Sequence, residues 1–221
     1  MPIATKCVSE ELSLEIAKAW GFRDHVLEAV PQRFLLDTDQ KTLIVALFSL
    51  AAEHHGAILH LLRATCFDGS AFALARPMLE ATIRAHWLTT RKSRTLVAKI
   101  VGGQDKYPFL KDMIADIDTG MTIGHLYKQL EPALKTFHGY THGGIEQLAR
   151  RFDAAGNVCS TYTDEAKIDL VRSMTAFMAL TAVTWSQVCS DTPGIESDHS
   201  RAITAEYGRL FEQRAKTASA L

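Results

Sequence analysis

The segment that decides the fold is DQKTLIVALFSLAAEHHGAILHLLRATC, Asp39 to Cys66. Its apolar residues recur at steps of three and four, the spacing of one face of an α-helix. A second row of apolar residues widens this stripe, so a long and largely buried helix is predicted. The first row is Leu43, Leu47, Leu50, Ala57 and Leu61, and the second is Ile44, Phe48, Ala51, Ile58 and Leu62.

Two further long helices complete the predicted core. One begins at the N-cap Ser70 and runs to Arg91, and its inward residues are expected to include Phe72 and Trp87. Because only a short turn separates it from the first long helix, the two should lie antiparallel. The other runs from Asp164 to Val188 and is apolar nearly all round, so it must be covered on most sides. A homodimer would cover it, and so would a central position in one subunit.

The rest of the 221-residue chain also has helical patterns, and no run alternates as a strand would. We predict an all-α, single-domain helical bundle over residues 1–221, with long central antiparallel helices. Residues 1–38 should form N-terminal helices that pack on this core. The other predicted helices cover residues 9–20, 23–36, 93–101, 108–117, 125–136, 145–152 and 197–216. The first should end at Gly21, Pro31 should kink the second and Pro132 should bend the helix 125–136. A turn is expected at 118–120, after the helix 108–117.

Composition excludes several classes of protein. The chain has 24 basic and 25 acidic residues, so its overall charge predicts no attraction to nucleic acid or to membranes. Its four cysteines are widely spread, which argues against a zinc knuckle or a redox dithiol and favours a reduced, cytoplasmic setting. The N-terminus lacks a signal-peptide pattern, and no stretch has the roughly 18 apolar residues of a membrane helix. No cofactor is predicted.

Polar residues interrupt the predicted apolar faces. His54 falls on the stripe of Leu47 and should be buried. Arg76 and Glu80 are one turn apart on the helix that buries Trp87, and charges on such a face need partners. They can bridge each other at the edge of the bundle, or they can converge with His54 to form a polar pocket.

The segment FHGYTHGGIEQLARRF, Phe137 to Phe152, places histidines and glycines together. His138 and His142 have the spacing of one helical face, but the glycines argue against a regular helix and no third metal ligand is evident, so no metal site is predicted. One interpretation is that Tyr140 and His142 point into the polar pocket. The alternative is a helix break packed tightly against a neighbour.

Basic residues cluster between Ala81 and Gln104, where no acid occurs. Such a stripe can bind the phosphate backbone of RNA, although it can also be a solvated face. The stripe consists of Arg84, Arg91, Lys92, Arg94 and Lys99.

The combination of ALARPMLEATIRAHWL, Ala73 to Leu88, with YTHGGIEQL, Tyr140 to Leu148, resembles a set of uncharacterised bacterial all-helical proteins. They share an Arg-x-x-x-Glu helix and a later histidine-glycine element, and they are distantly similar to HEPN-type bundles and abortive-infection proteins. The resemblance implies an RNA-cleaving homodimer whose motif is Arg-x4–6-His. Here no arginine lies four to six residues before His142, and Lys135 is the nearest basic residue.

Three functions are therefore open. The first is a HEPN-like ribonuclease of the toxin or phage-defence kind, without a metal, in which His142 transfers protons, Arg76 binds phosphate, Glu80 orients them and Tyr140 assists. In this first function, His54, His138 and Arg84 would contact the ligand. The second is a non-catalytic bundle that binds a small anionic ligand or a protein partner. The third is a metal-dependent hydrolase that uses His54, His138, His142 and Glu80.

Overall fold

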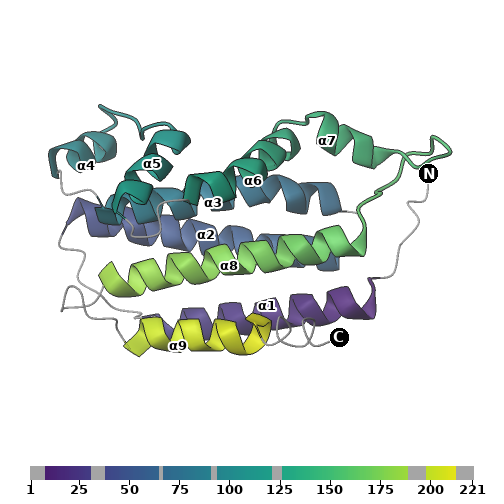
Figure 1. The fold of residues 1–221 in the computed structure, drawn as a ribbon, viewed down its shortest axis with the longest axis horizontal. Coiled ribbons are helices and arrows are strands. Elements are labelled where there is room, and N and C mark those ends of the chain that lie inside the picture. Colours follow the sequence, from purple (N-terminus) through teal and green to yellow (C-terminus); the bar gives the residue numbers. More distant parts are fainter. Residues whose placement is uncertain are drawn as a thin grey trace.

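The computed structural model describes residues 8–30, 38–64, 67–90, 94–120, 126–188 and 198–212, and most of them are helical (Figure 1). Within these ranges there is no strand, and Phe152 and Val158 form an isolated bridge. The all-α prediction is confirmed. The elements are α1 (Glu10–Ala29), α2 (Asp39–Arg63), α3 (Asp68–Thr90), α4 (Arg94–Val101), α5 (Leu110–Gly120), α6 (Leu126–Thr141), α7 (Ile145–Leu148), the 3₁₀ turn η1 (Ala149–Arg151), α8 (Asp164–Val188), α9 (Asp198–Tyr207) and the π-helical end η2 (Gly208–Glu212).

Two helix starts follow capping residues in the sequence, whereas α3 begins at Asp68, so the predicted N-cap at Ser70 is wrong. The hydroxyl of Ser9 accepts a hydrogen bond from the backbone N–H of Leu12 at 3.3 Å. The hydroxyl of Thr163 accepts one from the N–H of Ala166, also at 3.3 Å. Each bond satisfies an amide that the first turn of a helix leaves without a partner. The starts of α1 and α8 were therefore predictable.

The first helix is longer than predicted. α1 continues through Gly21 to Ala29, so the predicted break at this glycine is wrong. An isolated glycine costs a helix only about 1 kcal/mol. Ile16 and Phe22, which flank it, are buried in the core, and this packing outweighs the cost. The predicted kink at Pro31 lies outside the described residues.

Two helices further along the chain are also longer than predicted. α5 continues to Gly120, so the turn expected at 118–120 is wrong. Ile117 near its end is fully buried, and this contact holds the last turn against the core. α6 continues to Thr141 and includes Gly139, where a break had been expected.

The core face of α2 is the second apolar row rather than the first. Ile44, Phe48 and Ala51 are buried, whereas Leu50 of the first row is 39% exposed. Both rows have helical spacing, so the pattern predicts the helix correctly. Which row faces the core depends on where the neighbouring helices pack.

The antiparallel arrangement of α2 and α3 is visible in one hydrogen bond. The side-chain Nε2 of Gln40, at the start of α2, donates to the carbonyl oxygen of Leu88, near the end of α3, at 2.5 Å. α8 packs across both helices, and its Trp185 ring stacks on Phe48 with centroids 4.6 Å apart. In Figure 1, α1 and α9 lie below α8, while α4 to α7 lie above α3.

The position of α8 explains its apolar composition. It packs against α1, α2, α3 and α9, so a single subunit already covers most of its surface. Three pairs of polar side chains join it to α2 and α3 and satisfy hydrogen-bonding groups that would otherwise be buried alone. They are His55 Nε2 with Thr175 Oγ1 at 3.1 Å, Thr82 Oγ1 with Thr181 Oγ1 at 2.8 Å, and His86 Nδ1 with Thr184 Oγ1 at 3.0 Å.

Among the described helices, α2 has the length and apolar composition that a membrane span requires, which the sequence had not led us to expect. Core helices of soluble proteins pass the same test, and one such helix is weak evidence for a span. In this fold α2 packs between α3, α8 and α1.

Candidate functional site

Three charged side chains form a row along the outer side of α3. One carboxylate oxygen of Glu80 accepts a hydrogen bond from Arg76 Nε at 2.9 Å, and the other accepts one from Arg84 Nη2 at 2.8 Å. The side chains of Arg76, Glu80 and Arg84 are 20%, 23% and 33% exposed. Spacing of four residues brings them together. We call these three residues the arginine row.

The arginine row carries a net positive charge, because two guanidinium groups share one carboxylate. Arg76 uses a second N–H group, on Nη1, to donate to the carbonyl oxygen of Leu134 in α6 at 3.1 Å. The Nε of Arg84 is buried and has no hydrogen-bond partner among the described residues. Each guanidinium has five N–H donors, so the row keeps donors for a further acceptor.

Tyr107, which the sequence did not mark as part of a site, borders the row. The guanidinium carbon of Arg84 lies 5.3 Å from the centre of the Tyr107 ring. Burial raises the pKa of Tyr107, and the positive charge of Arg84 partly opposes this. Trp87 makes an edge contact with Tyr107 and donates from Nε1 to Asp116 Oδ2 at 2.9 Å. The cation-π contact of Arg84 with Tyr107 depends on the path of the chain after α4, which the spacing of residues in the sequence does not show.

Pro77 explains how α6 docks beside the row. A proline inside a helix has no N–H group, so the carbonyl oxygen of Ala73, four residues earlier, loses its usual donor. The hydroxyl of Thr141 in α6 lies 3.2 Å from that oxygen and 2.9 Å from its own helix's Phe137 oxygen, and it can donate to either. The proline therefore leaves an acceptor that α6 can use.

His138 and His142 lie on the exposed side of α6, with ring centroids 4.5 Å apart. The prediction that His142 points into a polar pocket is wrong, because its side chain is exposed. The backbone oxygen of Leu134 and the hydroxyl of Thr141 meet Arg76 and Ala73 of α3, so this stretch of α6 lies against α3.

Gly143 and Gly144 form a helix stop, while Gly139 lies inside α6. Gly143 has a φ of 64°, the left-handed conformation typical of the residue after a helix. The N–H of Gly144 donates to the carbonyl oxygen of Gly139 at 2.6 Å, the six-residue bond of a Schellman motif. At Gly139 a Cβ would lie 2.1 Å from Glu146 Oε2, so its missing side chain makes room for the carboxylate.

Tyr140 lies in the core rather than in a polar pocket. It is 7% exposed, and its ring centre is 5.1 Å from that of Phe72 and 6.0 Å from that of Tyr162. Tyr140 therefore packs among aromatic rings of the core. Phe72, which it contacts, is one helical turn, or roughly 6 Å along the axis, from Arg76, the first residue of the arginine row.

His54 is half-buried rather than buried. Burial lowers its pKa, and Glu53 partly opposes this. The fully buried histidine is its neighbour His55, so the prediction had the wrong one of the pair. The error has the same origin as the choice of apolar row in α2, because the two residues lie 100° apart around the helix axis.

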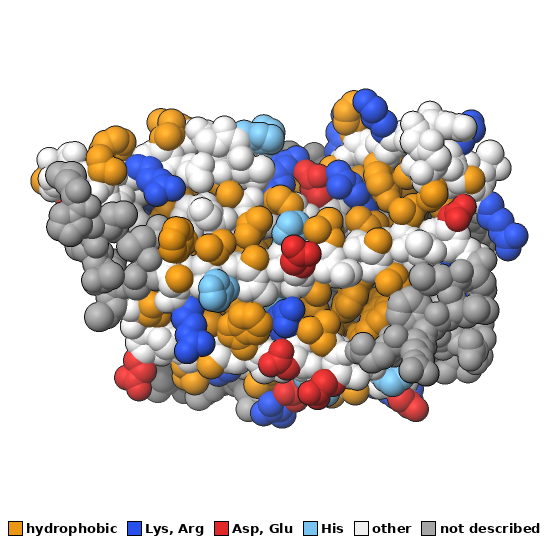
Figure 2. All heavy atoms as spheres, turned by 180° about the vertical axis from the view of Figure 1, so that it is seen from behind, with side chains coloured by type: hydrophobic (Ala, Val, Ile, Leu, Met, Phe, Trp, Pro, Cys, Tyr) orange, Lys and Arg blue, Asp and Glu red, His pale blue; other side chains and the backbone are white. Residues whose placement is uncertain are grey.

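Figure 2 shows the upper edge of the molecule dipping between two raised parts, and basic and acidic side chains lie together in the dip. The raised parts are formed by α4 with α5 and by α6 with α7. Among the described residues, no group of three or more His, Cys, Asp or Glu side chains is placed to hold a metal ion. The ligand set imagined for a metal-dependent hydrolase therefore does not assemble there.

Comparison with known proteins adds one finding. No curated protein and no solved structure matches the chain significantly. Residues 48–213, well over half of the chain, match the model of a family of unknown function, and the arginine row and both exposed histidines lie within this range. The chain therefore belongs to the family of unknown function DUF6988.

Proposed function

We propose that this protein binds a small phosphate-bearing anion at the arginine row without chemical change to it. The observation that carries the proposal is the single carboxylate of Glu80 held between two guanidiniums, which fixes both cations and leaves a net positive charge. Arginine donors fixed in this way suit bidentate contact with phosphate. The partial burial of the row strengthens such contacts relative to a fully solvated pair.

Calorimetry with inorganic pyrophosphate at low salt tests this proposal. Arg84→Gln should weaken binding by about tenfold or more, because a hydrogen bond to a charged group is worth about 1.5–3 kcal/mol. Arg209→Gln is the matched control, since Arg209 is likewise paired with a carboxylate, that of Glu206 in α9, but lies outside the row. Equal affinity in both variants would reject the row as the binding site.

A second candidate function is metal-independent RNA cleavage, favoured by the exposed imidazole pair of His138 and His142. One imidazole would accept the proton of an RNA 2′-hydroxyl as its oxygen attacks phosphorus. The other would protonate the leaving 5′-oxygen, giving a 2′,3′-cyclic phosphate. Arg76 would stabilise the added negative charge. Under this proposal the protein resembles HEPN proteins, forms a homodimer as they do and is cytoplasmic.

A fluorogenic RNA assay tests the second candidate. His142→Ala should lower the cleavage rate by about 100-fold or more, the usual contribution of a general acid or base. It should leave the thermal midpoint unchanged, because the ring is exposed. His199→Ala in α9 removes another exposed histidine and serves as the control. A wild-type protein that leaves RNA intact would eliminate this function and leave anion binding in place.

A further inference from the structure

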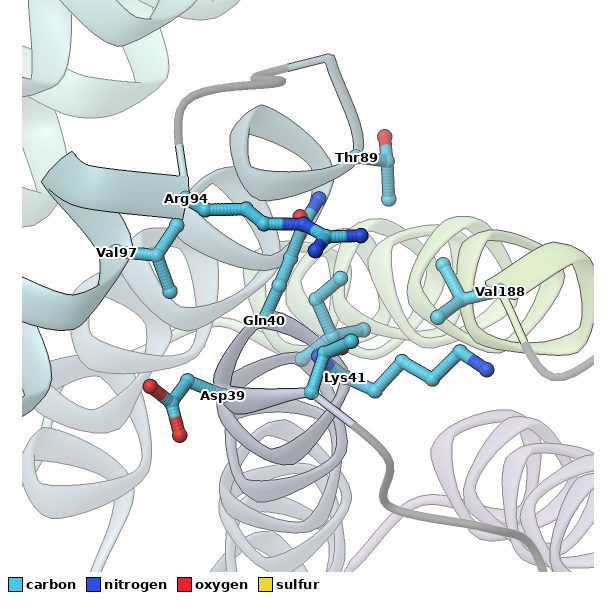
Figure 3. A pocket seen from close by; sticks show the side chains of 9 residues that line it. Asp39, Gln40, Lys41, Thr89, Arg94, Val97 and Val188 are labelled. Carbon is cyan, nitrogen blue, oxygen red and sulfur yellow. The ribbon is translucent and has the colours of Figure 1, made fainter.

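A pocket of about 530 Å³ lies at the other end of α3 from Tyr140, and neither of the functions proposed above uses it. Four helices form its walls: the first turns of α2, the last turn of α3, the start of α4 and the end of α8 (Figure 3). Its volume is within the range of small-molecule sites. We call it the end pocket.

The lining of the end pocket is amphipathic. Val188 is half-buried and supplies aliphatic surface, and Ile44 and Val97, which are almost fully buried, reach the pocket with a small part of their side chains. Thr38 and Thr89 add hydroxyl groups. A ligand seated here would place carbon atoms against the three aliphatic side chains, which favours a molecule with an apolar part over inorganic phosphate.

Charges in the end pocket favour an anion. Among the described residues of the lining, Lys41 and Arg94 are basic and Asp39 is acidic. In Figure 3 the Arg94 side chain extends across the pocket over Gln40 and that of Lys41 extends toward Val188, while the Asp39 carboxylate points away from both. The amino end of α2, which opens here, adds a smaller positive contribution.

One wall of the end pocket is held in place by hydrogen bonds. The Gln40 side chain is tied to the Leu88 carbonyl of α3, and the Thr38 hydroxyl accepts from the N–H of Lys41 at 3.2 Å. The pocket is therefore built by contacts between helices rather than by one exposed side chain. Thr38, Gln40 and Lys41 precede residue 48, where the match to the family model begins, whereas the arginine row lies within the matched residues.

We propose that the end pocket binds a small organic carboxylate with an aliphatic or aromatic part. The carboxylate lies by Arg94 and Lys41, and the apolar part lies against Val188 and the small parts of Ile44 and Val97 that reach the pocket. The charge of the lining selects an acid over an alcohol of equal size, and its apolar surface selects a longer acid over acetate. This proposal is independent of anion binding at the arginine row.

Thermal-shift and calorimetric titrations of the full chain with hexanoate, hexanol and acetate test the proposal. Hexanoate should bind more tightly than either other probe, because it alone satisfies both the charge and the apolar surface. Weaker or equal binding of hexanoate relative to hexanol or to acetate would overturn the proposal.

Three variants locate the site. Arg94→Gln should weaken hexanoate binding by about tenfold, the usual scale for loss of a charge-assisted hydrogen bond. Lys99→Gln, which removes an exposed charge from the same helix outside the lining, should have no effect. Arg84→Gln should also have none. Arg94 is exposed, so its variant should fold, and circular dichroism checks this. Unchanged binding by Arg94→Gln, or a loss confined to Arg84→Gln, would show that the end pocket is not the site.

Discussion

His55 shows how much the setting of one residue matters in this protein. Its Nε2 lies 3.1 Å from Thr175 Oγ1, and that hydroxyl donates to the Val171 carbonyl oxygen at 2.7 Å. Thr175 therefore accepts from the Nε2–H of a neutral imidazole. The Nδ1 atom is buried and has no partner among the described residues. Burial lowers the pKa of His55 to about 3, and the charge of Arg23 adds to the effect.

This burial predicts acid sensitivity. The folded pKa lies below the unfolded value of about 6.5, so the unfolded state gains a proton first and stability falls as pH drops through 6.5 toward 3. Between pH 7.5 and 5.0, the wild type should lose about 2 kcal/mol more unfolding free energy than His55→Gln. Urea denaturation at both pH values measures the difference.

The comparison with His55→Gln isolates one group, since His54 and His86, whose pKa values burial also lowers, remain in both proteins. Glutamine keeps a side-chain donor for Thr175. Parallel loss of stability in the two proteins would mean that His55 is protonated, or hydrated, in the folded state.

At the scale of elements, the glycines that follow α6 stop the helix that carries His138. Gly143, in the left-handed conformation, reverses the chain so that Ile145 can begin α7. Local chemistry was enough to predict a stop here, because the residues Gly143 and Gly144 are typical of one. The local sequence did not show that the helix would continue past Gly139.

Gly143→Ala should therefore lower the unfolding free energy by about 1–2 kcal/mol, the cost of a left-handed conformation for a residue with a Cβ. Gly143→Asn should cost less, since asparagine tolerates this region better. Urea midpoints of the two variants give the comparison. Gly21→Ala, inside α1 with no atom within 4 Å of its new Cβ, should stabilise the protein instead. An alanine tolerated at 143 would contradict the assigned helix stop.

At the scale of the whole molecule, α1 is part of the same core as the family-matched region. Its Leu12, Ile16 and Phe22 are buried with residues of α2, α3 and α8 in one cluster. Glu15 of α1 is 3% exposed in its side chain and pairs with Arg172 of α8, whose Nε lies 2.9 Å from its carboxylate. Although burial opposes ionisation, Arg172 keeps the pKa of Glu15 below its usual value. These contacts tie α1 to the helices of the family-matched region.

One core predicts one unfolding transition. Phe22 packs edge-on against Tyr207 and Phe211, so Phe22→Ala should cost about 3–5 kcal/mol, as is usual for a buried phenylalanine. In a Trp20→Phe background, which removes the tryptophan of α1, helicity and tryptophan fluorescence should shift together, since Trp87 and Trp185 lie in α3 and α8. Early loss of part of the helicity, with the tryptophan fluorescence of this background unchanged, would show that α1 and α9 form a separate unit.

Local pattern explains most of the fold. The spacing of apolar residues determines α2, α3 and α8, and Ser9 and Thr163 determine the starts of two helices, because these effects act within one or two turns of the chain. The pairing of Arg76 with Glu80 was likewise readable from a four-residue step.

What only the tertiary structure decided is which face each helix buries and which distant groups meet. His55 rather than His54 enters the core, His142 faces outward, and the end pocket joins residues of α2, α4 and α8. A helix of 3.6 residues per turn offers several adjacent apolar rows, and rotation by one residue costs little locally. The packing of neighbouring helices selects among these rows, so the charges and cavities of this protein are fixed only when the bundle is complete.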